Sequence, residues 1–239
     1  MPFATNPDGT KIHYEVEGAG SPLVLVHGFG GSLETWRERG YVDALKNDLQ
    51  LILIDARGHG QSDRPTNEED YDWRSRVLDV VAVLGDLELE KAHLLGYSMG
   101  GAIAQSCNIY APQRFHSLII GGSSPYGMAG DGWAERPFEE MWAARAERDE
   151  SQRDVIAAGF ASLGKFNGSV QALSMRRVPA LLFAGTEDHG PIEGVQRLAA
   201  AEGIPALILE GKDHGTAVDA VEVVAPRVLE FIREVEAYA

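Results

Sequence analysis

One serine lies between glycines at the point where a predicted strand turns into a predicted helix. Residues 92–95 form a nearly continuous apolar run, and the segment 96–101 after them reads GYSMGG. So tight a turn strains the backbone of its middle residue, and small neighbours let the chain pass without clashes. The hydroxyl of Ser98 would then stand clear of the sheet. The amide of Met99 would lie at a helix N-terminus, where negative charge is favoured. The pattern predicts Ser98 as a nucleophile.

A serine hydroxyl is a poor nucleophile until a base takes its proton. The chain has seven histidines, and position favours His214. It lies in GKDHG (211–215), between the last predicted strand and the last predicted helix. Loops at the carboxyl ends of parallel strands gather at one edge of the sheet, so this loop can reach Ser98. His13 and His116 fall within strand patterns and are predicted to be structural, and His93 belongs at the far end of the Ser98 strand.

The base needs a carboxylate that fixes its tautomer. The predicted strand 178–184 is followed by GTEDHG (185–190), and we choose Asp188 there, with Glu187 as the alternative. Asp213 is a weaker candidate, since it is adjacent to His214 and the side chains of adjacent residues point apart. The predicted order along the chain is therefore Ser98, Asp188, His214.

An anionic intermediate on Ser98 would need backbone donors. The predicted strand 23–26 leads into HGFGG (27–31), and a glycine-rich turn after a strand leaves amides facing a ligand. The amides of Phe29 and Met99 are the predicted pair. His27 is predicted to hold this loop through backbone hydrogen bonds rather than to act in catalysis. We place the following residues around the substrate: His27, Gly28, Tyr97, Trp133 and Trp142.

The segment DARGHGQSD (55–63) follows another predicted strand and admits two interpretations. Asp55, His59 and Asp63 would form a metal site in one of them. We favour the other, a buried turn in which Asp55 and Arg57 satisfy the loop backbone and each other. Three separated ligands in a glycine-rich loop lack the helical spacing that is typical of zinc sites. No metal is therefore predicted.

Apolar strand-like runs alternate with helical patterns, which predicts an α/β fold with a mostly parallel sheet. The turn signal NPDG (6–9) predicts an antiparallel hairpin at one edge of that sheet. Helices are expected near 41–47, 73–87, 99–110, 192–201 and 226–238, with Pro226 in the first turn of the last one. We assign residues 1–124 and 178–239 to the core. Residues 125–177 form a helical insert over the strand ends, including one helix that packs on the sheet before Val178, and the insert carries these large apolar residues: Trp133, Phe138, Met141, Trp142, Phe160 and Phe166.

Composition limits the classes of partner. The 239 residues carry a formal charge of −15, which repels phosphate backbones and makes nucleic-acid binding a poor hypothesis. The single cysteine, Cys107, excludes an intramolecular disulfide and is expected to be a small buried side chain. No signal-peptide pattern starts the sequence, and no apolar run is long enough to span a bilayer. We therefore expect a cytoplasmic protein with no membrane span.

Five motifs in this order resemble those of the α/β-hydrolase superfamily: HGFGG, DARGHGQSDRP, GYSMGG, GTEDHGP and KDHG. The resemblance implies an eight-stranded sheet whose second strand is antiparallel. It also implies Ser98 as nucleophile, His214 as base, Asp188 as acid, the Phe29 and Met99 amides as oxyanion hole, and 125–175 as a reduced cap. Dehalogenases and epoxide hydrolases of the superfamily carry Asp at the position of Ser98, and proline iminopeptidases carry an HGGPG-type loop. The present chain resembles none of these three.

The leading hypothesis is a serine hydrolase that cleaves a small carboxylic ester through an acyl-enzyme, with no metal or organic cofactor. Cleavage of a C–C bond, a lactone or a thioester on the same triad is the alternative, and a perhydrolase is a third. A ligand receptor that signals through a mobile cap is the hypothesis from a different class. The short insert favours an open pocket or one completed by a second subunit of a homo-oligomer.

Overall fold

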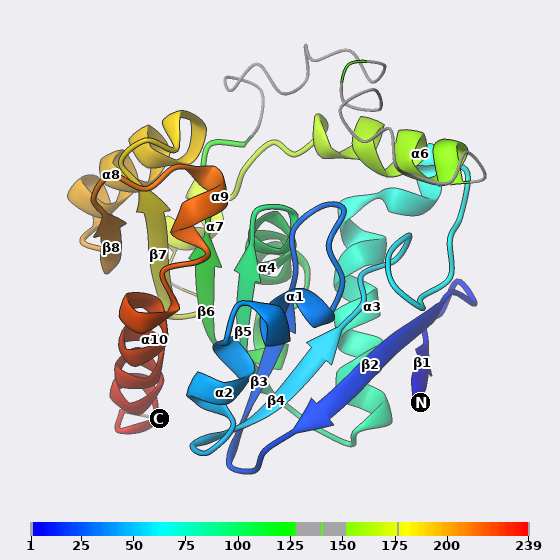
Figure 1. Ribbon diagram of the computed structural model, residues 1–239, viewed down its shortest axis with the longest axis horizontal. Coiled ribbons are helices and arrows are strands. Elements are labelled where there is room, and N and C mark those ends of the chain that lie inside the picture. Colours follow the sequence, from blue (N-terminus) through cyan, green and yellow to red (C-terminus); the bar gives the residue numbers. More distant parts are fainter. Residues whose placement is uncertain (1, 128–139, 141–151, 176, 239) are drawn as a thin grey trace.

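The computed structural model describes residues 2–127, 140, 152–175 and 177–238. Its eight-stranded sheet has the order β1-β2-β4-β3-β5-β6-β7-β8 (Figure 1). The strands are β1 (Phe3–Thr5), β2 (Lys11–Glu17), β3 (Ser21–Val26), β4 (Leu49–Ile54), β5 (Ala92–Tyr97), β6 (Phe115–Gly121), β7 (Ala180–Gly185) and β8 (Ala206–Leu209). β2 pairs antiparallel with both β1 and β4, and the strands from β3 to β8 are parallel. The expected sheet and its edge hairpin are confirmed.

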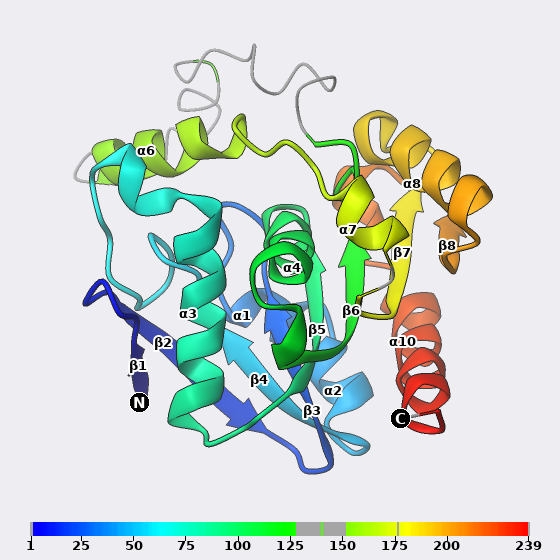
Figure 2. The same cartoon turned by 180° about the vertical axis from the view of Figure 1, so that it is seen from behind.

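Helices cover both faces of the sheet. They are α1 (Glu34–Glu38), α2 (Tyr41–Leu45), α3 (Trp73–Asp86), α4 (Met99–Tyr110), α6 (Arg153–Leu163), α7 (Val170–Ser174), α8 (His189–Glu202), α9 (His214–Ala217) and α10 (Val221–Glu236), with short 3₁₀ turns η1 (Glu68–Tyr71) and η2 (Pro112–Arg114). α3 and α4 lie side by side on one face, as seen in Figure 2, and α10 packs on the other. None of the helices in the described ranges is long and apolar enough to cross a bilayer.

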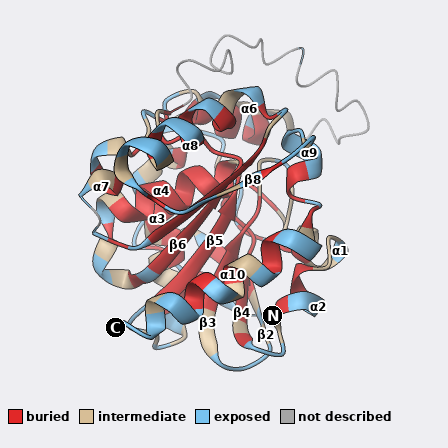
Figure 3. Cartoon of the chain, turned by 90° about the vertical axis from the view of Figure 1, so that its left-hand side faces the viewer, coloured by how far each residue is buried: buried red, intermediate tan, exposed pale blue. Residues whose placement is uncertain are grey.

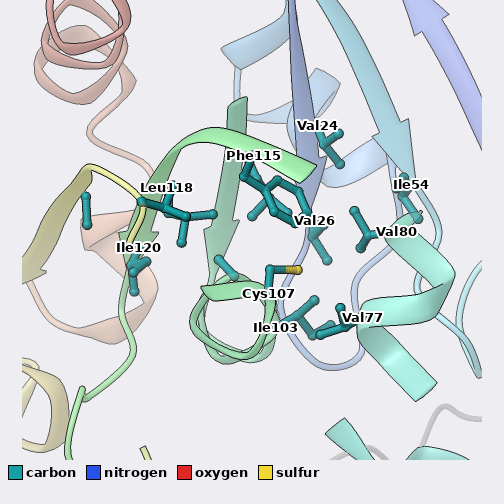
Figure 4. Packing of buried hydrophobic residues seen from close by; sticks show 14 of the residues in the cluster. Val24, Val26, Ile54, Val77, Val80, Ile103, Cys107, Phe115, Leu118 and Ile120 are labelled. Carbon is teal, nitrogen blue, oxygen red and sulfur yellow. The ribbon is translucent and has the colours of Figure 1, made fainter. Parts of the chain in front are cut away.

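The core lies in two layers because alternate strand residues point to opposite faces. On β3, Val24 and Val26 join the cluster under α3 and α4, whereas Leu23 and Leu25 join the cluster under α10. Burial on both faces, seen for the central strands in Figure 3, explains why β3, β4, β5, β6 and β7 are mostly apolar, whereas β2 near the sheet edge alternates polar and apolar residues. Cys107 on α4 packs in the first layer (Figure 4), as a small buried side chain should.

One helix differs from expectation. α10 begins at Val221 rather than near Pro226, so the proline lies inside the helix and not in its first turn. The reason is the apolar stripe, which extends upstream through Val224 and Ala225, both buried against the sheet. Their burial outweighs the hydrogen bond that a proline cannot donate.

The insert is described only in part. α6 lies across the carboxyl edge of the sheet in Figure 1, and α7 packs Ala172 and Leu173 into the core before β7. Phe160 and Phe166 are buried, in contact with Phe29 and Trp73 respectively. Four expected aromatic or apolar residues lie outside the described residues: Trp133, Phe138, Met141 and Trp142. The division into core and insert stays a prediction.

Candidate active site

Ser98 occupies a strained turn between β5 and α4. Its φ of 56° and ψ of −114° are unusual for a residue with a side chain. The turn is possible because Gly96 and Gly100, two residues away on either side, lie in tight contact with backbone. A Cβ on Gly96 would lie 2.0 Å from the Gly100 carbonyl oxygen, and one on Gly100 would lie 1.9 Å from the Val26 carbonyl oxygen. The glycines of GYSMGG are therefore required by packing, and they present the Ser98 hydroxyl at the carboxyl edge of the sheet.

His214 and Asp188 meet this serine. The Nε2 atom of His214 lies 2.9 Å from Ser98 Oγ, and its Nδ1 atom lies 2.9 Å from Asp188 Oδ2. The carboxylate is buried, with 6% of its side chain exposed, whereas the imidazole is 49% exposed. A carboxylate only accepts hydrogen bonds, so Nδ1–H donates to Asp188 and Nε2 offers its lone pair to the serine hydroxyl. This arrangement can withdraw a proton from Ser98.

The two rival carboxylates are placed differently. Glu187 is exposed. Asp213 caps α9, where its carboxylate accepts hydrogen bonds from the Thr216 amide and hydroxyl. These hydrogen bonds lower the pKa of Asp213. Of the three candidates, Asp188 is the one within hydrogen-bonding distance of the imidazole.

Tyr97 supports His214. Its hydroxyl donates to the His214 carbonyl oxygen at 2.6 Å, and the two rings lie 5.4 Å apart. Burial raises the pKa of this phenol, so it stays a donor. Sequence reasoning placed Tyr97 at the substrate. Tyr97 does border a cavity together with Ser98 and His214, but its hydroxyl oxygen holds the His214 loop.

The HGFGG loop passes directly over Ser98, because a Cβ on Gly28 would lie 3.3 Å from Ser98 Cβ. His27 holds this loop as expected. Its Nε2 atom accepts from the Ala56 amide at 3.1 Å, so its Nδ1–H must donate to the Gly28 carbonyl at 2.8 Å. Burial lowers the pKa of this imidazole, which favours the neutral form that both bonds require. The role of the Phe29 and Met99 amides as oxyanion donors stays a prediction.

His59, which the sequence suggested only as a possible metal ligand, acts in the same way. The Nε2 atom of His59 accepts from the Gly30 amide at 2.9 Å, and its Nδ1–H donates to the Arg57 carbonyl at 3.0 Å. The His27 and His59 rings are 5.1 Å apart. The shared role could have been predicted from the sequence, because a His-Gly dipeptide follows both β3 and β4.

The loop after β4 is a buried turn, but one expected pair is wrong. Asp55 accepts from the Leu33 and Gln61 amides and contacts His13 Nδ1. Arg57 does not pair with it. The guanidinium instead binds both oxygens of Asp79 at 2.6 Å, a carboxylate on α3 that the local sequence does not reveal.

Two cavities adjoin the HGFGG loop. One, of about 370 Å³, is bordered by Ser98, His214 and Tyr97 together with the loop and α1. The other, of about 280 Å³, lies between the loop and α6 and is bordered by Tyr71, Val155, Ile156 and Gly159. Phe29 borders both. Of the predicted substrate contacts, His27, Gly28 and Tyr97 border the first cavity, and Trp133 and Trp142 lie outside the described residues.

A sequence profile for the alpha/beta hydrolase fold matches residues 21–161, more than half of the chain. The chain belongs to the alpha/beta hydrolase family. The solved structure of a hydrolase from Pseudomonas aeruginosa PA01 is similar to this alpha/beta hydrolase, with a TM-score of 0.80 and 26% identity over 97% of each chain.

Curated relatives carry several hydrolase names. The 3-oxoadipate enol-lactonase 1 of Acinetobacter baylyi is 31% identical over 223 residues, which cover 87% of this chain and 77% of the relative. The pimeloyl-(acyl-carrier protein) methyl ester esterase of Aeromonas hydrophila is 39% identical over 123 residues, which cover 52% of this chain and 46% of the relative. For other matched relatives the aligned part is 44% or 35% of their length.

Proposed function

We propose that this alpha/beta hydrolase is a serine esterase that cleaves small carboxylic esters through an acyl-enzyme, with Ser98, His214 and Asp188 as its catalytic triad. One observation carries the proposal. The strained Ser98 hydroxyl, the half-exposed imidazole of His214 and the buried carboxylate of Asp188 are joined by two contacts of 2.9 Å. This is the arrangement that activates a serine hydroxyl toward a carbonyl carbon.

The reaction follows from these atoms. Nε2 of His214 takes the Ser98 proton as Oγ attacks the ester carbonyl, and Asp188 stabilises the resulting imidazolium. The amides of Phe29 and Met99 receive the oxyanion. The imidazolium then protonates the leaving alcohol, and water attacks the acyl-enzyme through the same steps in reverse. Apart from the substrate and this water, each step uses side chains or backbone of the chain itself.

The cavity beyond Phe29 is our candidate for the apolar part of the substrate. Its walls carry Tyr71 and the Val155, Ile156 and Gly159 face of α6, and it shares Phe29 with the Ser98 cavity. The polar side chains of Arg64 and Gln152 also border this cavity, and its apolar part, next to the Ser98 cavity, favours an uncharged acyl or alcohol group.

Hydrolysis of p-nitrophenyl butyrate tests the proposal. We expect wild-type protein to turn over this ester and Ser98→Ala to lose the activity. Ser106→Ala is the matched control, because that hydroxyl lies on the same helix and bonds to the Ala102 carbonyl. A phosphonate inhibitor should add its mass to wild type and not to Ser98→Ala. Equal turnover by wild type and Ser98→Ala would reject Ser98 as the nucleophile.

Hydrolysis of a lactone is the second candidate, favoured by the enol-lactonase relative, whose match covers most of both chains. A lactone is a cyclic ester, so the same triad would open it. A panel of enol-lactones, thioesters and p-nitrophenyl esters ranks these substrates by kcat/KM. The ester proposal requires the simple esters to be turned over faster than the rest of the panel.

A further inference from the structure

Arg76 places a positive charge in the interior beside the start of α4. Its side chain lies in the second turn of α3, and 2% of the residue is exposed. Nε donates to the Tyr71 carbonyl at 3.0 Å, one terminal nitrogen to Met99 Sδ at 3.2 Å, and the other to Ser162 Oγ at 2.7 Å. The guanidinium also lies 5.2 Å from the ring centres of Tyr71 and Trp73. Each of these partners is neutral.

The environment of Arg76 differs from that of the other buried arginine, Arg57. Arg57 is equally buried but forms a bidentate ion pair with Asp79 and a further contact with Asp8. No carboxylate among the described residues lies within salt-bridge distance of Arg76. Asp79 and Asp72 are the carboxylates whose charges raise the pKa of Arg76. Asp79 is already bound by Arg57, and Asp72 is exposed at the N-cap of α3. The interior at this point therefore carries an excess of positive charge.

The charge persists at neutral pH. Burial, with a smaller contribution from the like charge of Arg57, lowers the pKa of Arg76 to about 10. Burying an ion without a counter-ion destabilises a fold, and such sites are concentrated where proteins act on ligands. A purely structural tie between α3 and α6 does not require a cation here, since a neutral side chain can reach the same acceptors.

The direction of the guanidinium points to a role. It touches the side chain of Met99, the residue directly after Ser98, whose backbone amide is a proposed oxyanion donor. α3 and α4 run side by side in Figure 2, and the contact to Met99 brings the cation to the first residue of α4. From the reach of an extended methionine and two hydrogen bonds, an oxyanion on the Met99 amide lies within about 13 Å of the guanidinium.

We propose that Arg76 is a positioning residue for the oxyanion: it fixes the Met99 side chain and supplies a buried positive charge that stabilises the anionic intermediate on Ser98. This inference rests on the proposed esterase function. At an effective dielectric constant of about 20, one charge at that distance accelerates the reaction about tenfold. The effect belongs to the transition state, so it appears in kcat and not in KM.

The test compares two charge removals on the same helix. Arg76→Met removes the buried cation and keeps an apolar side chain that fills the space, whereas Arg74→Met removes an exposed one. We measure kcat and KM for p-nitrophenyl butyrate and the inhibition constant of phenylboronic acid, which forms an anionic tetrahedral adduct with the serine oxygen. We expect Arg76→Met to lower kcat and weaken the boronic acid about tenfold each, with KM within twofold. Arg74→Met should change neither.

Two further variants separate the effect of the Arg76 charge from that of its hydrogen bonds. Ser162→Ala removes the acceptor on α6 but keeps the cation, and should retain wild-type kcat. Arg76→Gln is neutral yet can still donate to Tyr71 or Ser162, and it carries the test if Arg76→Met does not fold. The proposal is overturned if a folded neutral variant keeps kcat and boronic acid affinity within twofold of wild type, or if Ser162→Ala loses as much as Arg76→Met. Because every rate is compared with a Ser98-dependent wild-type rate, these outcomes are distinct from failure of the esterase proposal, which Ser98→Ala reports.

Discussion

Replacing Tyr97 with phenylalanine removes the hydroxyl that holds the His214 loop and leaves the ring in place. The change is small, because the ring lies against the imidazole and is enclosed by Phe183. α9, which begins with His214, is only four residues long, so the imidazole depends on few contacts. Besides the contacts to Asp188 and Ser98, these include the Asp213 cap and the bond from Tyr97. Loss of that bond should let the base move away from Ser98.

The size of the effect follows from the geometry. The bond is 2.6 Å long and part-buried, so deleting its donor leaves a carbonyl with impaired hydrogen bonding. Such a loss lowers the free energy of unfolding by about 1–3 kcal/mol. For a chain of this length, each kcal/mol corresponds to a fall in Tm of roughly 2–4 °C. If about 1.4 kcal/mol of this free energy holds the imidazole in place, kcat for p-nitrophenyl butyrate should fall about tenfold in Tyr97→Phe, with little change in KM.

The assay needs a control that loses a phenol elsewhere. Tyr110→Phe serves, since that residue is half exposed at the end of α4. We expect Tyr97→Phe to lower both Tm and kcat and Tyr110→Phe to lower neither. A lowered Tm with an unchanged kcat would show that the bond stabilises the fold without placing the base, and the reasoning would then be wrong.

Three further predictions concern the acid, the cavity and pH. Asp188→Asn should lower kcat by about 10³–10⁴-fold at an unchanged Tm, because the amide favours the wrong imidazole tautomer; retained activity would exclude this carboxylate as the acid. Gly159→Val should raise KM for p-nitrophenyl octanoate about tenfold and leave KM for the acetate unaffected, since even a Cβ added at this position would lie 3.2 Å from Phe29; equal effects on both esters would place the acyl chain elsewhere. Burial lowers the pKa of His93 to about 4, so the unfolded chain binds more protons between pH 4 and about 6.5, and stability falls as pH drops through that range. Urea unfolding should show about 2 kcal/mol lost between pH 7 and pH 5 through this group, and His93→Gln should abolish that part.

The strands, and the meeting of Ser98, Asp188 and His214 at one edge of the sheet, were predictable because each depends on short-range sequence. A strand buried on both faces needs an uninterrupted apolar run, and Ser98, Asp188 and His214 each lie in a short loop that follows such a run. Parallel strands bring those loops to one edge whatever the intervening sequence contains. The helix over Pro226 was placed wrongly because the sequence shows the proline but not the burial that compensates for it.

The supporting contacts were not predictable in the same way. Arg57 pairs with Asp79, 22 positions away on α3, rather than with Asp55 in its own loop. The Tyr97 hydroxyl reaches a carbonyl 117 positions away. Neither contact has a periodicity or a spacing that a single sequence displays, since each is set by how elements pack after the sheet has formed.

The loops that meet at Ser98 are held by buried polar groups that do not touch the reacting atoms. Neutral His27 and His59 hold the loop over the serine, and Tyr97 holds the loop that carries His214. Hydrogen bonds of this kind are costly to leave unmade in the interior, so each fixes one geometry rather than a range of them. A variant that retains Ser98, Asp188 and His214 but loses one of these supports should therefore fold and still lose rate. Protonation of His27 has the same consequence, because the cation cannot accept the hydrogen bond from the Ala56 amide.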